Sequence, residues 1–134
     1  MSSHDDLAST DGAFPPEVQA VRSVLGSPSG YYFGMEGIAA GKGFGSNAVQ
    51  LSMGEDLYLE MYDLGRKRDV AGLVRFYLDF DDDLEYFMPY DVFRKFLQDV
   101  ARRFIRDHPD ERAEAQRALE LAIETVRSLE AASS

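Results

Sequence analysis

The sequence predicts an α+β fold with a short N-terminal helix, a four-stranded antiparallel meander and two C-terminal amphipathic helices packed on one sheet face. Apolar and polar residues alternate through much of residues 31–80, as in half-buried strands. On either side, apolar residues recur at helical spacing. A run of strands beside helices is typical of α+β domains. The 134 residues fit one domain, which we place at residues 14–130.

The N-terminal stretch, residues 1–13, is small, polar and acidic, which predicts a disordered tail. A helix should begin at Pro15 and Pro16, because proline suits the first helical turn, and Glu17 lies near the positive end of the helix dipole. Gly26 is a natural stop for this helix. Its apolar stripe consists of Val18, Val21, Val24 and Leu25.

The middle of the chain contains four segments in which apolar side chains occupy every second position. We expect strands at residues 31–36, 49–53, 57–62 and 74–80. A glycine-rich connection at 39–45, a tight turn at 54–56 and a charged loop at 65–69 separate them. Short connections of this kind predict an antiparallel meander with one buried face.

The last part of the chain is helical. One helix should open at Pro89 or Asp91 and end near Asp107, and a second should run from Pro109 to about residue 130. Both carry apolar residues at helical spacing, which should pack against one face of the sheet. The expected core consists of Val74, Phe76, Leu78, Phe93, Phe96, Val100, Phe104, Leu119, Ile123 and Val126.

The chain is strongly acidic, with 24 acidic residues, 14 Lys and Arg, and a formal net charge of −10. This disfavours binding to a nucleic-acid backbone, which needs a basic face. No apolar run approaches a membrane span, and no secretory signal opens the chain, so we expect a cytoplasmic protein without membrane contact. The acidity has two interpretations: solubility or salt adaptation, and recognition of a basic partner.

Motifs for catalysis and cofactors fail on inspection. The glycine-rich segment 41–46 does not have the glycine spacing of a phosphate loop. It is also expected to lie between two strands, whereas a phosphate loop connects a strand to a helix. The acidic segment 79–85 begins like a calcium loop, but Leu84 stands at the glycine position. His4 lies in the expected tail and His108 at a helix junction, so no histidine pair is available. We therefore expect no metal, no cofactor and no catalytic residues.

Two groups of residues are the candidate binding surface. The first lies in residues 79–91, which hold six acids, no base and several aromatic residues, a combination suited to gripping Lys and Arg. Its members are Asp79, Asp81, Asp82, Asp83, Glu85, Tyr86 and Tyr90. The second group comprises tyrosines expected on the outer face of the sheet, namely Tyr58, Tyr62 and Tyr77.

These observations favour a non-enzymatic protein-binding module that masks a basic protein partner, such as a toxin or nuclease, in the manner of an inhibitor or immunity protein. Three alternatives stay open. One is a ligand-binding or sensory domain with a cavity between sheet and helices, and another is a binder resembling a secretion chaperone. The last is a small enzyme that relies on carboxylates and tyrosines.

Overall fold

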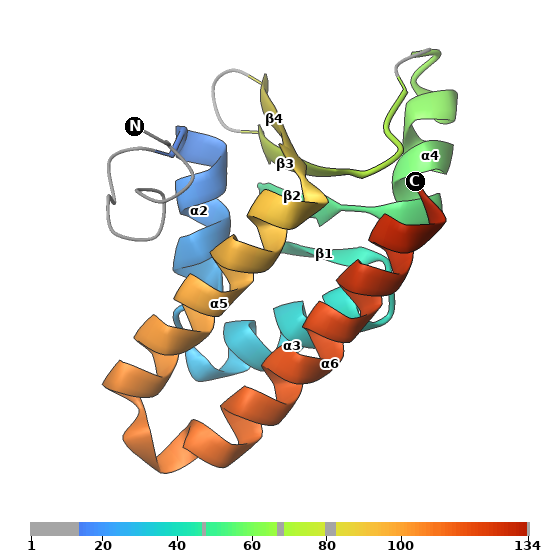
Figure 1. Ribbon diagram of the computed structural model, residues 1–134. Coiled ribbons are helices and arrows are strands. Elements are labelled where there is room, and N and C mark those ends of the chain that lie inside the picture. Colours follow the sequence, from blue (N-terminus) through green and yellow to red (C-terminus); the bar gives the residue numbers. More distant parts are fainter. Residues whose placement is uncertain (1–13, 47, 67–68, 80–82, 134) are drawn as a thin grey trace, which may run out of the picture.

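A computed structural model of the chain describes residues 14–46, 48–66, 69–79 and 83–133 (Figure 1). The elements are α2 (Pro16–Val24), α3 (Pro28–Ala39), β1 (Gly43–Ser46), β2 (Val49–Ser52), α4 (Gly54–Asp63), β3 (Leu73–Asp79), β4 (Asp83–Pro89), α5 (Tyr90–Asp107), a 3₁₀ turn (Pro109–Glu111) and α6 (Arg112–Ala132). The predicted α+β fold is confirmed. The tail expected at residues 1–13 lies outside the described residues.

The sheet is an antiparallel meander with strand order β1-β2-β3-β4, as predicted. Its register places Leu51 of β2 beside Phe44 on one side and beside Phe76 on the other. Two strands, β2 and β3, occupy the expected segments. The other two do not, because residues 31–36 and 57–62 are helical.

Residues 31–36 belong to α3, which corrects the first expected strand. Ser27 caps this helix by accepting a hydrogen bond from the Gly30 amide, and Pro28 suits its first turn. Its buried residues recur at helical spacing: Tyr31, Gly34, Met35 and Ile38. The apolar residues of this segment fit both the alternation of a strand and the spacing of a helix. The N-terminal cap and the packing against α6 favour the helix.

Residues 57–62 belong to α4, which corrects the third expected strand. Leu57 and Met61, one helical turn apart, are its buried residues. Gly54 and Gly65 flank the helix with φ values of 62° and 69°, a left-handed conformation that glycine adopts readily. The sheet takes its other two strands from β1, in the glycine-rich connection, and β4, in the acidic run, where neighbouring strands supply the hydrogen-bond partners.

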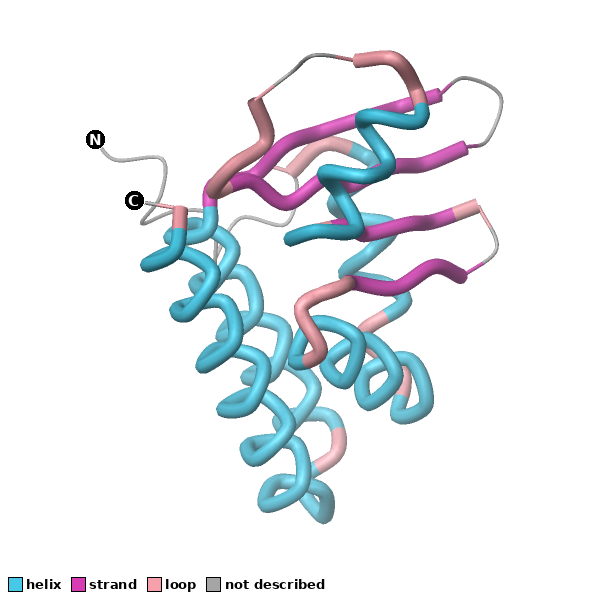
Figure 2. Tube along the Cα trace, turned by 90° about the vertical axis from the view of Figure 1, so that its right-hand side faces the viewer, coloured by secondary structure: helices cyan, strands magenta, loops and turns pink. Residues whose placement is uncertain are grey.

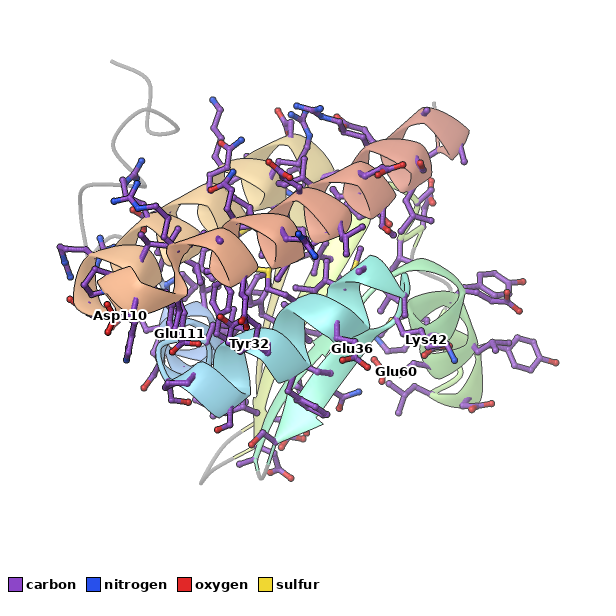
Figure 3. All side chains as sticks on the ribbon, turned by 90° about the horizontal axis from the view of Figure 1, so that it is seen from below. Tyr32, Glu36, Lys42, Glu60, Asp110 and Glu111 are labelled. Atoms are coloured by element: carbon purple, nitrogen blue, oxygen red, sulfur yellow. The ribbon has the colours of Figure 1, made fainter. Side chains whose placement is uncertain are left out.

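One face of the sheet packs against α2 and α5, and α6 packs on α3 and α5 (Figure 1). All ten residues of the predicted core are buried. The ring of Phe76 meets those of Phe93 and Phe96 at centroid distances of 6.1 and 5.6 Å, so aromatic rings occupy the space between β3 and α5. The hydroxyl of Tyr32 donates to Glu111 at 2.9 Å and ties α3 to the start of α6 (Figure 3).

The other face of the sheet carries α4, which crosses the strands there (Figure 2). Side chains alternate along β3, so Val74, Phe76 and Leu78 face the core. Arg75 and Tyr77 point toward the α4 side. None of the helices within the described ranges combines the length and apolarity needed to cross a bilayer.

Candidate protein-binding surface

The sheet face beneath α4 brings together four of the candidate residues. Tyr77 pairs with Glu85 and Asp79 pairs with Asp83 in the β3–β4 register, so all four project to the same side. Tyr58 and Tyr62, expected on a strand, reach this side of the molecule on α4 instead. The candidate surface is therefore assembled from a helix and a hairpin.

Two candidate residues lie elsewhere. Tyr90 opens α5 and is only 4% exposed, and burial raises its pKa, so the expectation of a surface contact at Tyr90 is wrong. Tyr86 is half-buried against the core, with its ring 6.4 Å from that of Phe76. The cause is β4: its alternation turns Tyr86 away from Glu85. Asp81 and Asp82 lie outside the described residues.

The outer side of α4 is aromatic. Tyr58 and Tyr62 are 62% and 74% exposed, and their spacing of four places them on one helical face. Leu59 and Leu64 are also exposed, at 48% and 56%. Since Leu57 and Met61 face the protein, α4 carries apolar side chains on two faces, one packed against the protein and the other open to solvent.

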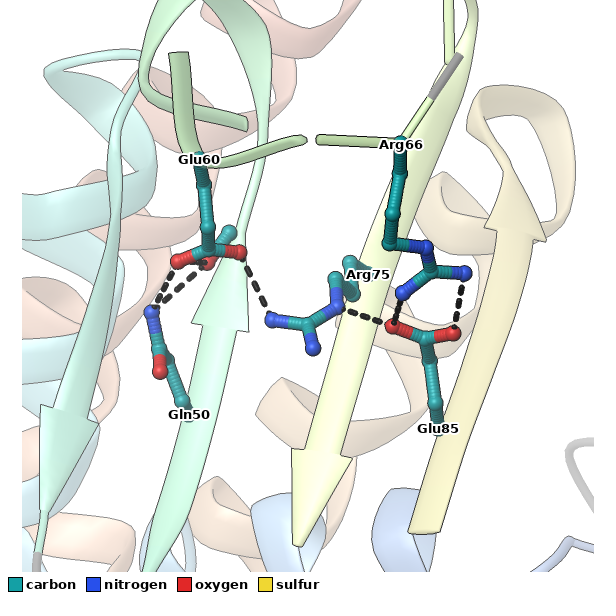
Figure 4. Close-up of polar contacts among 6 residues, drawn as sticks. Gln50, Glu60, Arg66, Arg75 and Glu85 are labelled. Atoms are coloured by element: carbon teal, nitrogen blue, oxygen red, sulfur yellow. Dashed lines mark hydrogen bonds and ion pairs between the residues drawn. The ribbon is translucent and has the colours of Figure 1, made fainter. Parts of the chain in front are cut away.

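A network of ion pairs and hydrogen bonds holds α4 to the sheet (Figure 4). Arg75 of β3 lies at its centre and donates to Glu60 of α4 at 2.7 Å and to Glu85 of β4. Arg66, just beyond α4, donates to both oxygens of Glu85 at 2.6 and 2.8 Å. Gln50 of β2 donates to Glu60 at 2.6 Å. The network joins α4 to three strands.

The electrostatics of this network favour the ionised form of Glu85. Hydrogen bonds from Arg66, reinforced by Arg75, lower the pKa of Glu85 to about 2 despite its partial burial. Arg75 is only 6% exposed, and the two carboxylates compensate its buried charge. Its guanidinium also lies 4.5 Å from the centre of the Tyr77 ring. The ionised Glu85 therefore keeps its ion pairs with Arg66 and Arg75 at neutral pH.

The charged side chains of α4 itself are all acidic. The helix contains Glu55, Asp56, Glu60 and Asp63 and no base. Beyond it, burial raises the pKa of Tyr77, helped by a hydrogen bond to Asp83 and by the negative charge of Asp79. The exposed acids thus flank the tyrosines on the α4 side, while Arg66 and Arg75 are paired within the network.

Within the ranges the structure describes, no three acidic or histidine side chains gather as ligands of one metal ion would. His108 stacks on Phe104, with ring centroids 4.4 Å apart, and its Nδ1 lies 3.1 Å from the carbonyl oxygen of that residue. This is a packing role at the end of α5.

No protein-family model, curated protein or solved structure matches this chain.

Sequence reasoning found the exposed tyrosines but missed the helix that presents them. The signal was present: Leu57 and Met61 have helical spacing, and a glycine stands at each end of the segment. Sequence reasoning also missed Leu59, Asp56 and Asp63 as surface residues. The helical phase of α4 alone determines where these side chains point.

Proposed function

We propose that this protein binds a basic protein partner through the outer side of α4. The observation that carries the proposal is the pair of exposed tyrosines, Tyr58 and Tyr62, on a helix with four acids and no base. Tyrosine is enriched at protein interfaces because its ring buries apolar area while its hydroxyl keeps a polar partner. Masking of a basic toxin or nuclease is the form of this function that the charge favours.

The two kinds of residue contribute differently. Asp79, Asp83 and the acids of α4 attract a cationic partner and accelerate encounter, an effect that salt weakens. Each exposed ion pair is worth only about 0–1 kcal/mol, so charge alone gives little affinity. Tyr58 and Tyr62 supply the burial that slows dissociation, since a few aromatic anchors dominate most interfaces.

The test begins with affinity capture from the native host, using the wild type and the double variant Tyr58→Ser/Tyr62→Ser. We expect a basic protein retained by the wild type and lost by the double variant. Leu121→Ser, which alters an exposed apolar residue of α6, is the matched control and should keep the partner. With the purified partner, losing one aromatic anchor should weaken binding about tenfold or more. Equal affinity of the wild type and the tyrosine variant for that partner would refute the proposal.

A further inference from the structure

A trough lies between α4 and the edge of the sheet, on the side of α4 away from Tyr58. Its volume is about 590 Å³. The floor lacks a side chain from the middle of β1, because Gly45, which pairs with Gln50, is the β1 residue that faces this side of the sheet. A methyl group added at Gly45 would meet only the Val49 carbonyl oxygen, 3.8 Å away. The absence of a side chain at Gly45 therefore keeps the trough open.

The walls of the trough offer hydrogen-bond acceptors and apolar surface. Asp56 and Asp63 of α4 line it with exposed carboxylates, and the exposed side chains of Leu59 and Leu64 lie beside them. The Gln50 amide nitrogen donates to Glu60 and Ser52, and its oxygen points away from Glu60 (Figure 4). These groups suit a ligand that carries positive charge on an apolar stem.

Among the described residues that line the trough, Lys42 is the one base; it follows the end of α3 and lines the trough together with Glu60 (Figure 3). Lys42 belongs to the Asp56 end, because its carbonyl accepts a hydrogen bond from Met53, just before α4. The described lining thus holds one ammonium group and three carboxylates, of which that of Glu60 is paired with Arg75. Charge complementarity selects a cationic occupant along the trough.

We infer that the trough binds an extended, arginine-bearing segment of the basic partner. The inference rests on the proposed function and names the feature of the partner that this site recognises. Asp56 and Asp63 are seven residues apart, so they lie on one face of α4, about 10.5 Å apart along its axis. In a polyproline II segment, side chains three residues apart point the same way and are separated by about 9 Å. Arginines spaced as Arg-x-x-Arg therefore match the two carboxylates, while their stems lie on Leu59 and Leu64.

The direct probe is a fluorescein-labelled peptide with the sequence Arg-Ala-Pro-Arg-Ala-Pro-Arg, titrated against the full chain at low salt. We expect saturable binding by fluorescence anisotropy, with the Gly43 and Gly45 amide signals shifting in NMR spectra. Gly45→Trp should fill the trough and weaken binding about tenfold, and Asp56→Asn/Asp63→Asn should do the same by removing charge. Leu121→Trp, on α6, is the matched control and should bind like the wild type. Circular dichroism checks that each variant folds.

Other results would overturn the inference. One is binding that Gly45→Trp leaves unchanged, and another is equal binding of a peptide of the same composition with its arginines contiguous. Failure here is distinguishable from failure of the proposed function. If the captured partner binds Gly45→Trp as it binds the wild type but loses affinity for Tyr58→Ser/Tyr62→Ser, the helix surface stands and the trough is excluded. If the tyrosine variant keeps full affinity for the partner, the proposed function itself fails.

Discussion

At the scale of single residues, the ion pair between Arg75 and Glu85 stabilises the fold by compensating a buried charge. Arg75 lies on the α4 side of the sheet, where alternation along β3 places polar residues, yet it is buried beneath α4. A buried guanidinium without carboxylates would destabilise the fold, since an isolated charge is costly to desolvate. Glu60 and Glu85 remove that cost by pairing with it from either side.

Glu85 should make the stability depend on pH. Its pKa of about 2 lies below the ordinary value of 4.5, so its contribution is complete above pH 4.5 and is lost as pH falls toward 2. Glu85→Gln should lower the free energy of unfolding at pH 7 by about 1–3 kcal/mol. In urea titrations, the difference in the free energy of unfolding between Glu85→Gln and the wild type should be clearly smaller at pH 3 than at pH 7. Glu124→Gln, which alters an exposed carboxylate of α6, is the control and should stay within about 0.5 kcal/mol of wild type. If the difference in the free energy of unfolding between Glu85→Gln and the wild type does not change with pH, the ion pairs of Glu85 are not its cause.

At the scale of elements, the contact between α3 and β1 depends on glycine. A Cβ atom at Gly37 of α3 would lie 2.1 Å from the carbonyl oxygen of Gly43, so this helix and strand approach more closely than any side chain permits. Gly43 itself has a φ of 100°, which disfavours other residues. The glycine-rich connection at residues 39–45 thus forms a packed corner that positions the trough.

Gly37→Ala and Gly45→Ala should therefore differ sharply. In an isolated helix, alanine at position 37 would be favourable by up to about 1 kcal/mol. Here the clash with β1 should dominate and lower the free energy of unfolding by about 1–3 kcal/mol. Gly45→Ala has open space and should change it by less than about 1 kcal/mol. Thermal and urea denaturation of the two variants provides the measurement, and a Gly37→Ala variant as stable as wild type would contradict the close contact.

At the scale of the whole molecule, one aromatic core joins the sheet to its helices. Phe76 contacts the rings of Tyr86, Phe93 and Phe96, and Phe104 stacks on Tyr31 with centroids 4.2 Å apart. Both phenylalanines belong to a single cluster of buried residues. Unfolding should therefore be one cooperative transition, detected together by far-UV and near-UV circular dichroism.

Truncating a buried aromatic side chain should lower the free energy of unfolding whether it lies beside the sheet or beside α3. Phe76→Ala and Phe104→Ala should each lower the free energy of unfolding by about 3–5 kcal/mol, because each leaves a cavity among buried rings. Leu121→Ala, at an exposed position of α6, should stay within about 0.5 kcal/mol of the wild type. The chain has no tryptophan, so urea denaturation is best monitored by circular dichroism. Two phenylalanine variants with wild-type stability would disprove the single core.

The fold could be predicted in those segments whose apolar residues follow either the helical or the strand spacing, but not both. The stripe of α5 and the alternation of β3 each admit one reading, and every core residue predicted from them is buried. Residues 31–36 and 57–62 carry both periods, so local pattern could not separate helix from strand. β4 was missed because the acids at its start resemble a solvated turn, although pairing with β3 makes it a strand.

The sequence by itself determines the α+β class, the two inner strands of the sheet, the two C-terminal helices and the acidic character of this protein, because these follow from composition and from unambiguous periodicity. Tertiary structure alone decides which side chains meet. It sets the helical phase of α4, which exposes Tyr58 and Tyr62, and the pairing of β3 with β4, which places Glu85 beside Arg75. It also buries Tyr90. The physical reason is that orientation and long-range contact depend on packing and hydrogen bonding between segments distant in the chain, which no local pattern encodes.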